Sequence, residues 1–161
     1  MKTHFLFPNQ FKIIGWFLFV PSLVISVLAT VLNWNIDNYF TCKVFAIYND
    51  GFFQNNSSAF FQIIENSLSD ELLTFSLVIG GLLVGFSKLK KEDEMIGQIR
   101  YESLVWATYF NYVILLLCTA FMYGISFLNV LFYNTFSLLL FFIIRFHYSI
   151  YKLNKQNSNE E

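Results

Sequence analysis

The sequence predicts an all-α integral membrane protein, a four-helix bundle made of two transmembrane hairpins with a partly structured loop outside the membrane. Composition is the first indication, because 56% of the 161 residues are hydrophobic and only 13% are charged. Soluble domains usually carry about a quarter charged residues, and a small soluble fold leaves too much surface in water to hide so many apolar side chains. The second indication is that the apolar residues fall into runs of membrane-spanning length.

The first crossing is predicted over about residues 13–32, a run without charge that matches a hydrocarbon core of about 30 Å. Pro21 interrupts this run, and a membrane helix tolerates proline when nearby hydroxyls re-satisfy the freed carbonyl. We expect a mild kink at Pro21, with a gating hinge as the alternative. Lys2 and Lys12 resemble the charged start of a signal peptide, but the apolar run is too long and contains proline. We therefore expect the segment to be retained as a crossing.

The outer loop is predicted over 33–70. It is acidic and rich in aromatic residues, which disordered loops lack, so we expect it to fold against the membrane surface or the end of the bundle. Asn49-Asp50-Gly51 is a turn signal and predicts a short hairpin between 41–48 and 52–53. A helix capped by Ser57 or Ser58 is predicted to follow, because apolar residues recur on one helical face at Phe60, Ile64 and Leu68.

The second crossing, about 70–87, carries small residues spaced four apart, which are Ser76, Gly80, Gly81 and Gly85. Small residues at this spacing let two helix backbones approach closely, and such packing is a main source of helix association in lipid. We expect this face to pack against the first or third crossing of the same chain. A homo-oligomer interface is the alternative.

The charged linker 88–102, KLKKEDEMIGQIRYE, separates the two hairpins and indicates their orientation. Every Lys and Arg of the chain except Lys43 lies in the N-terminal leader, in this linker or after the fourth apolar run. Cytoplasmic segments retain Lys and Arg, so both termini and the linker are predicted to be cytoplasmic, in a multi-pass protein of the inner membrane. The acidic residues that follow the lysines favour a helix start near Lys91, with Gly97 as a weak point.

The third and fourth crossings are predicted over about 104–123 and 127–146, followed by a cytoplasmic tail, 147–161. Their apolar runs contain the amides Asn111, Asn129 and Asn134. An unsatisfied amide in lipid costs several kcal/mol, so these side chains are predicted to face one another or helix backbones. Hydrogen bonds between helices are the favoured interpretation, and a polar pathway or ligand site is the alternative.

The residue pattern gives no indication of catalysis. The apolar runs contain no acidic residue, which argues against proton transport through a buried carboxylate, and the chain has no H-E-x-x-H, G-x-S-x-G or C-x-x-C motif. Cys42, predicted outside, and Cys118, predicted in the membrane, make neither a disulfide nor a metal site. His4 and His147 are expected as interfacial residues. The sequence therefore predicts no enzyme activity, cofactor or metal, and the net charge of −1 gives no reason to expect nucleic acid.

The linker and the start of the third crossing offer charged residues to a partner, which are Glu92, Asp93, Glu94, Arg100 and Glu102. For Arg100 and Glu102 a salt bridge or a lipid-headgroup contact is one interpretation. A docking site for a cytoplasmic protein is the other.

The same region, about residues 88–118, resembles a segment of small uncharacterised four-helix membrane proteins of Bacteroidetes-type bacteria. The residues that carry the resemblance are the run 92–96 with Ile99-Arg100, Ser103-Leu104 and Trp106-Ala107. The resemblance implies a membrane-bound companion or regulatory protein, and it transfers no catalytic residue. We therefore expect a non-enzymatic protein that binds lipid on its surface and contacts a cytoplasmic partner in sensing or regulation, with a small oligomeric transporter or channel as the alternative.

Overall fold

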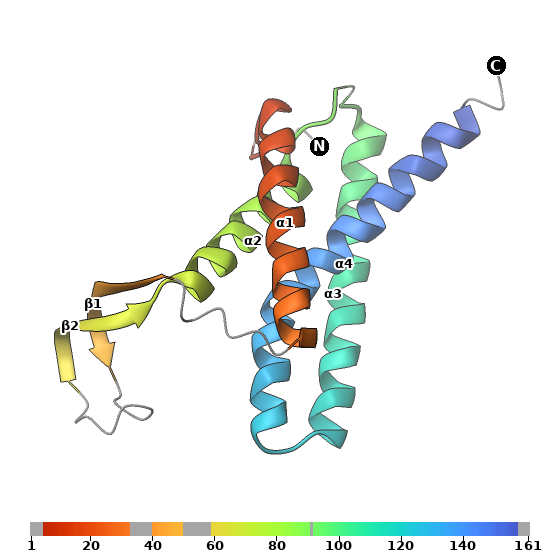
Figure 1. The fold of residues 1–161 in the computed structure, drawn as a ribbon. Helices are drawn as coiled ribbons and strands as arrows, with labels where there is room; N and C mark the ends of the chain where they lie inside the picture. The colour runs from red at the N-terminus through yellow and green to blue at the C-terminus, as the bar shows by residue number, and fades with distance from the viewer. Residues whose placement is uncertain (1–4, 33–39, 50–58, 91, 158–161) are drawn as a thin grey trace. The chain divides into compact units, whose positions relative to one another are not determined.

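The computed structural model describes residues 5–32, 40–49, 59–90 and 92–157. In these ranges the chain forms four helices and one β-hairpin (Figure 1), namely α1 (Gln10–Leu32), β1 (Thr41–Asn49), β2 (Ala59–Ser67), α2 (Ser69–Phe86), α3 (Glu94–Phe121) and α4 (Ile125–Asn157). All four helices are long and apolar enough to cross a membrane, so the helical conformation of the four predicted crossings is confirmed. The chain divides into two compact units, Met1–Pro21 with Leu77–Glu161, and Ser22–Ser76.

The first two helices lie close to their predicted bounds. α1 continues through Pro21 without a break in the helix. α2 begins at Ser69 with Asp70 and Glu71 in its first turn, where negative charge is stabilised by the helix dipole. With 18 residues, α2 is about 27 Å long. It therefore just matches the thickness of a hydrocarbon core.

α3 begins at Glu94 and is continuous through Gly97. Asp93 is its N-cap, with an extended backbone and a side-chain oxygen that accepts a hydrogen bond from the Glu94 N–H at 2.7 Å. The helix therefore starts three residues after Lys91, near which its start was predicted, because an aspartate side chain is a preferred acceptor for the open N–H groups of a first turn. Gly97 donates its N–H to the Asp93 carbonyl, and one glycine costs a helix only about 1 kcal/mol.

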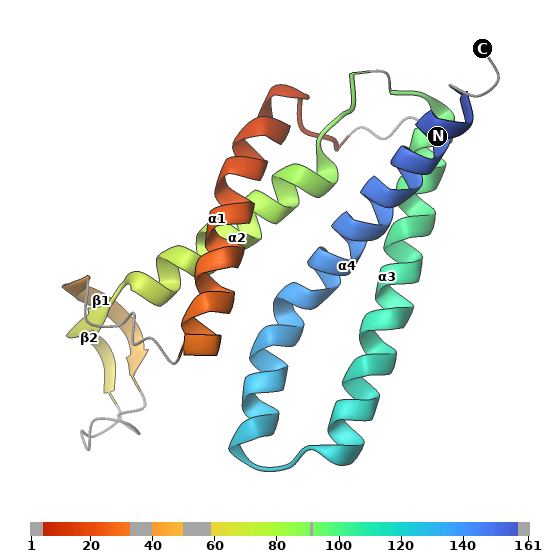
Figure 2. The same ribbon diagram turned by 45° about the vertical axis from the view of Figure 1, so that its right-hand side comes forward.

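α4 continues beyond the fourth predicted crossing to Asn157. Lys155 lies in its last turn, where a cation is favoured by the helix dipole. The helix therefore includes residues 147–157 of the segment predicted as a cytoplasmic tail. A short turn joins α3 to α4, with Gly124 at φ 74°, a left-handed conformation that glycine adopts without strain. The two helices run side by side and antiparallel from this turn (Figures 1 and 2).

In the unit Ser22–Ser76 the predicted helix after residue 57 is wrong, because 59–67 forms strand β2. β2 pairs antiparallel with β1 in a register that sets Phe45 opposite Ile63 and Lys43 opposite Glu65. Aromatic and β-branched residues favour strands and gain from cross-strand contacts, such as the ring contact between Tyr48 and Phe60 at 4.9 Å. The other predicted strand, 52–53, and the predicted caps, Ser57 and Ser58, lie outside the described residues.

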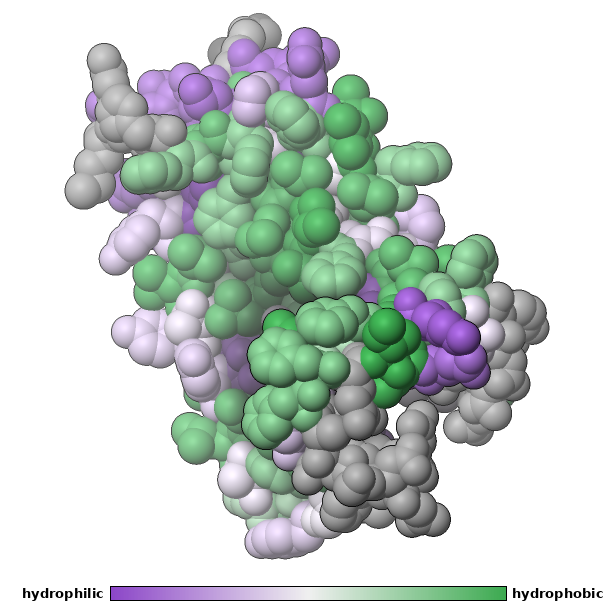
Figure 3. Space-filling view, turned by 90° about the vertical axis from the view of Figure 1, so that its left-hand side faces the viewer, coloured by the Kyte–Doolittle hydropathy of each residue, from purple (hydrophilic) through white to green (hydrophobic). Residues whose placement is uncertain are grey.

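The buried core of the other unit is small and lies between the helices. Its buried apolar side chains are Phe19, Leu77, Val84, Ala107, Phe142, Ile143 and Phe146. Large apolar residues elsewhere on all four helices are exposed, and the space-filling view shows a broad apolar face below a hydrophilic end (Figure 3). Exposed apolar surface on this scale is unusual for a soluble monomer and is compatible with lipid around the helices.

Candidate functional site

A buried arginine connects the linker to three helices. Arg100 lies in the second turn of α3 and is 5% exposed. Its Nη1 donates to Glu92 Oε1 at 2.8 Å, and its Nη2 donates to the Ser87 carbonyl oxygen at 3.2 Å. The guanidinium also stacks over the ring of Phe146 from α4, 5.0 Å from the ring centre. We call Ser87, Glu92, Arg100 and Phe146 the arginine cluster.

Local structure explains how Glu92 reaches this position. The Leu89 N–H donates to Glu92 Oε2 at 2.8 Å. This hydrogen bond holds the Glu92 carboxylate against the linker backbone just before α3. One carboxylate therefore holds both the linker backbone and the guanidinium. An ion pair with charge-assisted hydrogen bonds satisfies a buried arginine that would otherwise be costly to desolvate. Within the described residues Arg100 Nε has no hydrogen-bond partner.

The segment before α1 also joins this end of the helices. Phe7 pairs with Ser87 as a single parallel β-bridge. Its N–H donates to the Phe86 carbonyl at 3.0 Å, and its carbonyl accepts from the Lys88 N–H at 2.9 Å. The Ser87 hydroxyl donates to the Leu83 carbonyl. The N-terminal segment, the end of α2 and the linker thus meet at Ser87, a member of the arginine cluster.

The five charged residues predicted as partner contacts divide into two sets. Glu92 and Arg100 pair with each other, with the Arg100 side chain buried and the Glu92 side chain partly exposed. Asp93, Glu94 and Glu102 are exposed. Asp93 caps α3, and Glu102 accepts a hydrogen bond from Gln98 Nε2 at 2.9 Å. The salt bridge considered for Arg100 and Glu102 does not join these two residues, because Arg100 pairs with Glu92 and Glu102 accepts from Gln98.

The glycine face of α2 is covered within the chain. A methyl group at Gly80 would lie 2.7 Å from the Phe19 backbone nitrogen of α1, and one at Gly85 would lie 2.6 Å from the Phe142 ring of α4. Gly81 meets Phe19 and Leu139 of α4. The contact with α1 was one of the two predicted, whereas the second neighbour is α4 and not the third crossing. Ser76, the fourth residue of this set, lies half-buried in the other unit.

Gly15 completes the contact of α1 with α2, and sequence analysis did not single it out. A methyl group at this position would lie 2.9 Å from the Val84 nitrogen and 3.0 Å from the Gly80 carbonyl oxygen. The two helices therefore approach through glycine on both sides. α1 has no second small residue four positions away to indicate this role, because position 19 is Phe.

The three amides in the apolar runs of α3 and α4 have different surroundings. Asn111 of α3 is 2% exposed, and its side-chain oxygen accepts a hydrogen bond from the Ser137 hydroxyl of α4. The same hydroxyl lies 3.1 Å from the Asn134 carbonyl oxygen. Asn129 departs from the prediction because it is exposed on α4. It lies about one turn from the start of the helix, where a polar side chain can reach the membrane surface.

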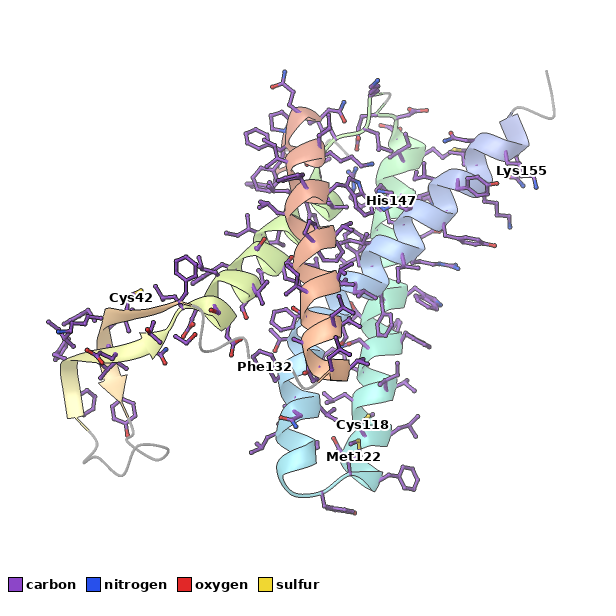
Figure 4. The ribbon with its side chains drawn as sticks, viewed as in Figure 1. Cys42, Cys118, Met122, Phe132, His147 and Lys155 are labelled. Carbon is purple, nitrogen blue, oxygen red and sulfur yellow. The ribbon has the colours of Figure 1, made fainter. Side chains whose placement is uncertain are left out.

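His147 contacts an aromatic ring and a backbone carbonyl, and both cysteines are free. The His147 ring meets Trp16 edge to face at 5.3 Å, and its Nδ1 lies 2.9 Å from the Ile143 carbonyl oxygen. His4 lies outside the described residues. Cys42 on β1 and Cys118 on α3 are free thiols (Figure 4). Across the described ranges, no group of three or more potential metal ligands occurs.

Comparisons with family models, curated proteins and solved structures give no match to this chain.

Proposed function

We propose that this chain is a non-enzymatic multi-pass protein of the inner membrane, in which the N-terminus, the linker and the C-terminus are cytoplasmic. Support for the membrane comes from the four apolar helices. Support for the orientation comes from the distribution of Lys and Arg. All of these residues except Lys43 lie in the segments proposed as cytoplasmic, and cytoplasmic segments of membrane proteins are enriched in Lys and Arg. The two helical pairs, α1 with α2 and α3 with α4, are the two transmembrane hairpins of this proposal.

We further propose that the linker and the start of α3 bind a cytoplasmic protein, in a sensory or regulatory role. The observation that carries this proposal is the ion pair of Arg100 with Glu92, 2.8 Å apart. It fixes the linker against the helices, while Asp93, Glu94 and Glu102 stay exposed next to it. A surface that is held in one conformation loses less entropy on binding than a mobile loop. The three exposed carboxylates favour basic side chains on the partner.

The alternative, an oligomeric transporter or channel, receives less support. Oligomerisation was expected to use the glycine face of α2, but Gly80, Gly81 and Gly85 are covered by α1 and α4 of the same chain. Within the predicted crossings the only acidic residues are Asp70 and Glu71 in the first turn of α2, so none lies at the depth that many proton-coupled transporters use. Neither observation favours a pore.

Site-specific photo-cross-linking in cells tests the partner proposal. A photoreactive amino acid at position 94 or 102 should cross-link one cytoplasmic protein, whereas the same group at position 65 on β2 should not. The captured protein, once purified, should bind the full-length protein in nanodiscs. Binding should fall at least tenfold in the variant Asp93→Ser, Glu94→Gln, Glu102→Gln, because it lacks the three exposed carboxylates. The fold should be preserved, since serine keeps the helix cap and glutamine keeps the hydrogen bond to Gln98. Equal binding of the two forms would contradict the proposal.

A further inference from the structure

A groove of about 280 Å³ lies between α3 and α4. Polar and charged side chains from both helices line it, including Glu102, Ser103, Arg145, Tyr148, Ser149 and Lys152. Sites that enclose whole small molecules have volumes of roughly 300–1,000 Å³. This groove is therefore of a size to hold a compact polar group, with the remainder of a larger molecule outside it.

The groove lies where the charged and uncharged parts of both helices meet. On α3, Glu102 is the last charged residue before an uncharged run that continues to Phe121. On α4, Arg145 is the first charged residue after an equally uncharged run from Ile125. If these runs cross a bilayer, the groove lies at the level of the lipid headgroups. This placement holds for either orientation of the chain in the membrane.

The groove carries more positive than negative charge. Arg145 and Lys152 are exposed, and neither forms an ion pair with a residue in the described part of the chain. The Arg145 guanidinium lies over the Trp106 ring, 5.1 Å from the ring centre, which orients the group while its N–H donors stay available. Glu102, the one carboxylate in the lining, already accepts a hydrogen bond from Gln98. Two cations and one carboxylate give the lining a net positive charge that suits a monoanion.

Ser103 supplies a second, independent indication of a ligand. It is 1% exposed and lines the groove. Its hydroxyl has no hydrogen-bond partner among the residues that the structure describes, although other hydroxyls on these helices bond to the carbonyl four residues earlier, as Thr108 does to Leu104. Buried polar atoms are nearly always satisfied, so an exception requires an explanation.

We propose that this groove binds the phosphodiester headgroup of an anionic membrane lipid. Arg145 and Lys152 pair with the phosphate oxygens, and the Ser103 hydroxyl donates to the headgroup. The acyl chains then lie along the exposed apolar surface of α3 and α4. The proposal does not depend on the cytoplasmic partner, because the cations that carry it are not among the residues assigned to that contact.

Lipid titration of the full-length protein tests the proposal. Phosphatidylglycerol and phosphatidylcholine are added to the protein in neutral detergent, and bound lipid is counted by native mass spectrometry. We expect tighter binding of phosphatidylglycerol. Arg145→Gln with Lys152→Gln should weaken it roughly 25-fold, because each basic side chain near an anionic surface contributes about fivefold. The matched control, Lys88→Gln with Lys90→Gln, removes two exposed cations from the linker and should change binding less than threefold.

Ser103→Ala separates a binding role from a structural one. Removing an unpaired buried hydroxyl should leave the lipid-free protein as stable as before or more stable, whereas phosphatidylglycerol binding should weaken severalfold. Competition with inorganic phosphate or glycerol phosphate identifies the source of the phosphate. Millimolar amounts of either should not displace the lipid. Displacement by these soluble anions, equal loss in the two double variants, or unchanged lipid binding in Arg145→Gln with Lys152→Gln would each overturn the assignment to a lipid.

Discussion

Arg100 Nη1 on α3 lies 2.8 Å from Glu92 Oε1 in the linker, although eight residues separate the two in sequence. The pair is also unequal in exposure, since the Arg100 side chain is 6% exposed and the Glu92 side chain 24%. The buried arginine therefore depends on the ion pair to offset its desolvation more than the partly exposed glutamate does. Because it also bonds to Ser87 and stacks on Phe146, one side chain fixes the linker relative to α2, α3 and α4.

Glu92→Gln should destabilise the protein by about 1–3 kcal/mol, since loss of one partner from a fully buried pair costs about 3–5 kcal/mol and Glu92 is partly exposed. Glu102→Gln is the matched control. It removes an exposed carboxylate while the amide oxygen can still accept from Gln98, so it should change stability by less than about 0.5 kcal/mol. Reversible unfolding in mixed detergent micelles measures both values. Similar losses in the two variants would show that the pair is not a structural contact.

Gly80→Ala and Gly97→Ala should have opposite effects, although both glycines are helical. At Gly80 the new methyl group would meet the Phe19 backbone at 2.7 Å, so α1 and α2 must separate at a cost of about 1–3 kcal/mol. At Gly97 nothing lies within 4 Å, and alanine should stabilise α3 by up to about 1 kcal/mol. Thermal unfolding of the two variants side by side provides the comparison. The close helix contact would be refuted by a neutral or stabilising Gly80→Ala.

The effects of replacing Asn111 and Ser137 on stability should be coupled, whereas replacing Asn129 should leave the stability unchanged. A double-mutant cycle with Asn111→Ala and Ser137→Ala isolates their hydrogen bond, for which we expect about 0.6–1.7 kcal/mol, the range found in membrane proteins. Asn129→Ala serves as the control because Asn129 is exposed. A coupling energy of zero, or a larger loss for Asn129→Ala than for Asn111→Ala, would contradict the described packing of α3 on α4.

The register of the hairpin should allow a specific disulfide. In a Cys42→Ser background, Phe45→Cys with Ile63→Cys places two thiols at directly opposed positions, within the Cα separation of about 4.4–6.8 Å that a disulfide requires. Val44→Cys with Ile63→Cys is the control, because neighbouring strand residues point to opposite faces. Mild oxidation and a gel shift on reduction report the bond. Efficient cross-linking of the control pair alone would indicate a register shifted by one residue.

The helices could be predicted because membrane-spanning length is a property of each segment by itself. An uncharged run such as 13–32 can be recognised without any information about the segments that pack against it. The strand 59–67 shows the limit of local patterns. Phe60, Ile64 and Leu68 have helical spacing, but the segment gains more from pairing with β1, which lies elsewhere in the chain.

The arginine cluster could not be predicted from local sequence patterns either. Helical spacing rules pair residues three or four positions apart, whereas Glu92 precedes α3 and meets Arg100 only after the linker turns. The stacking of Phe146 depends on how α4 packs against α3, which no spacing within one helix indicates. The same holds for Leu139 and Phe142, which cover the glycine face from α4.

We propose that four helices cross a membrane with the linker in the cytoplasm. Labelling of single cysteines in intact cells tests this topology. The native thiols are removed by Cys42→Ser and Cys118→Ser, Lys90→Cys reports on the linker, and Glu65→Cys reports on the hairpin. We predict that a membrane-impermeant maleimide labels Glu65→Cys in intact cells and Lys90→Cys only after permeabilisation. Labelling of Lys90→Cys in intact cells, with Glu65→Cys protected, would contradict the proposed orientation.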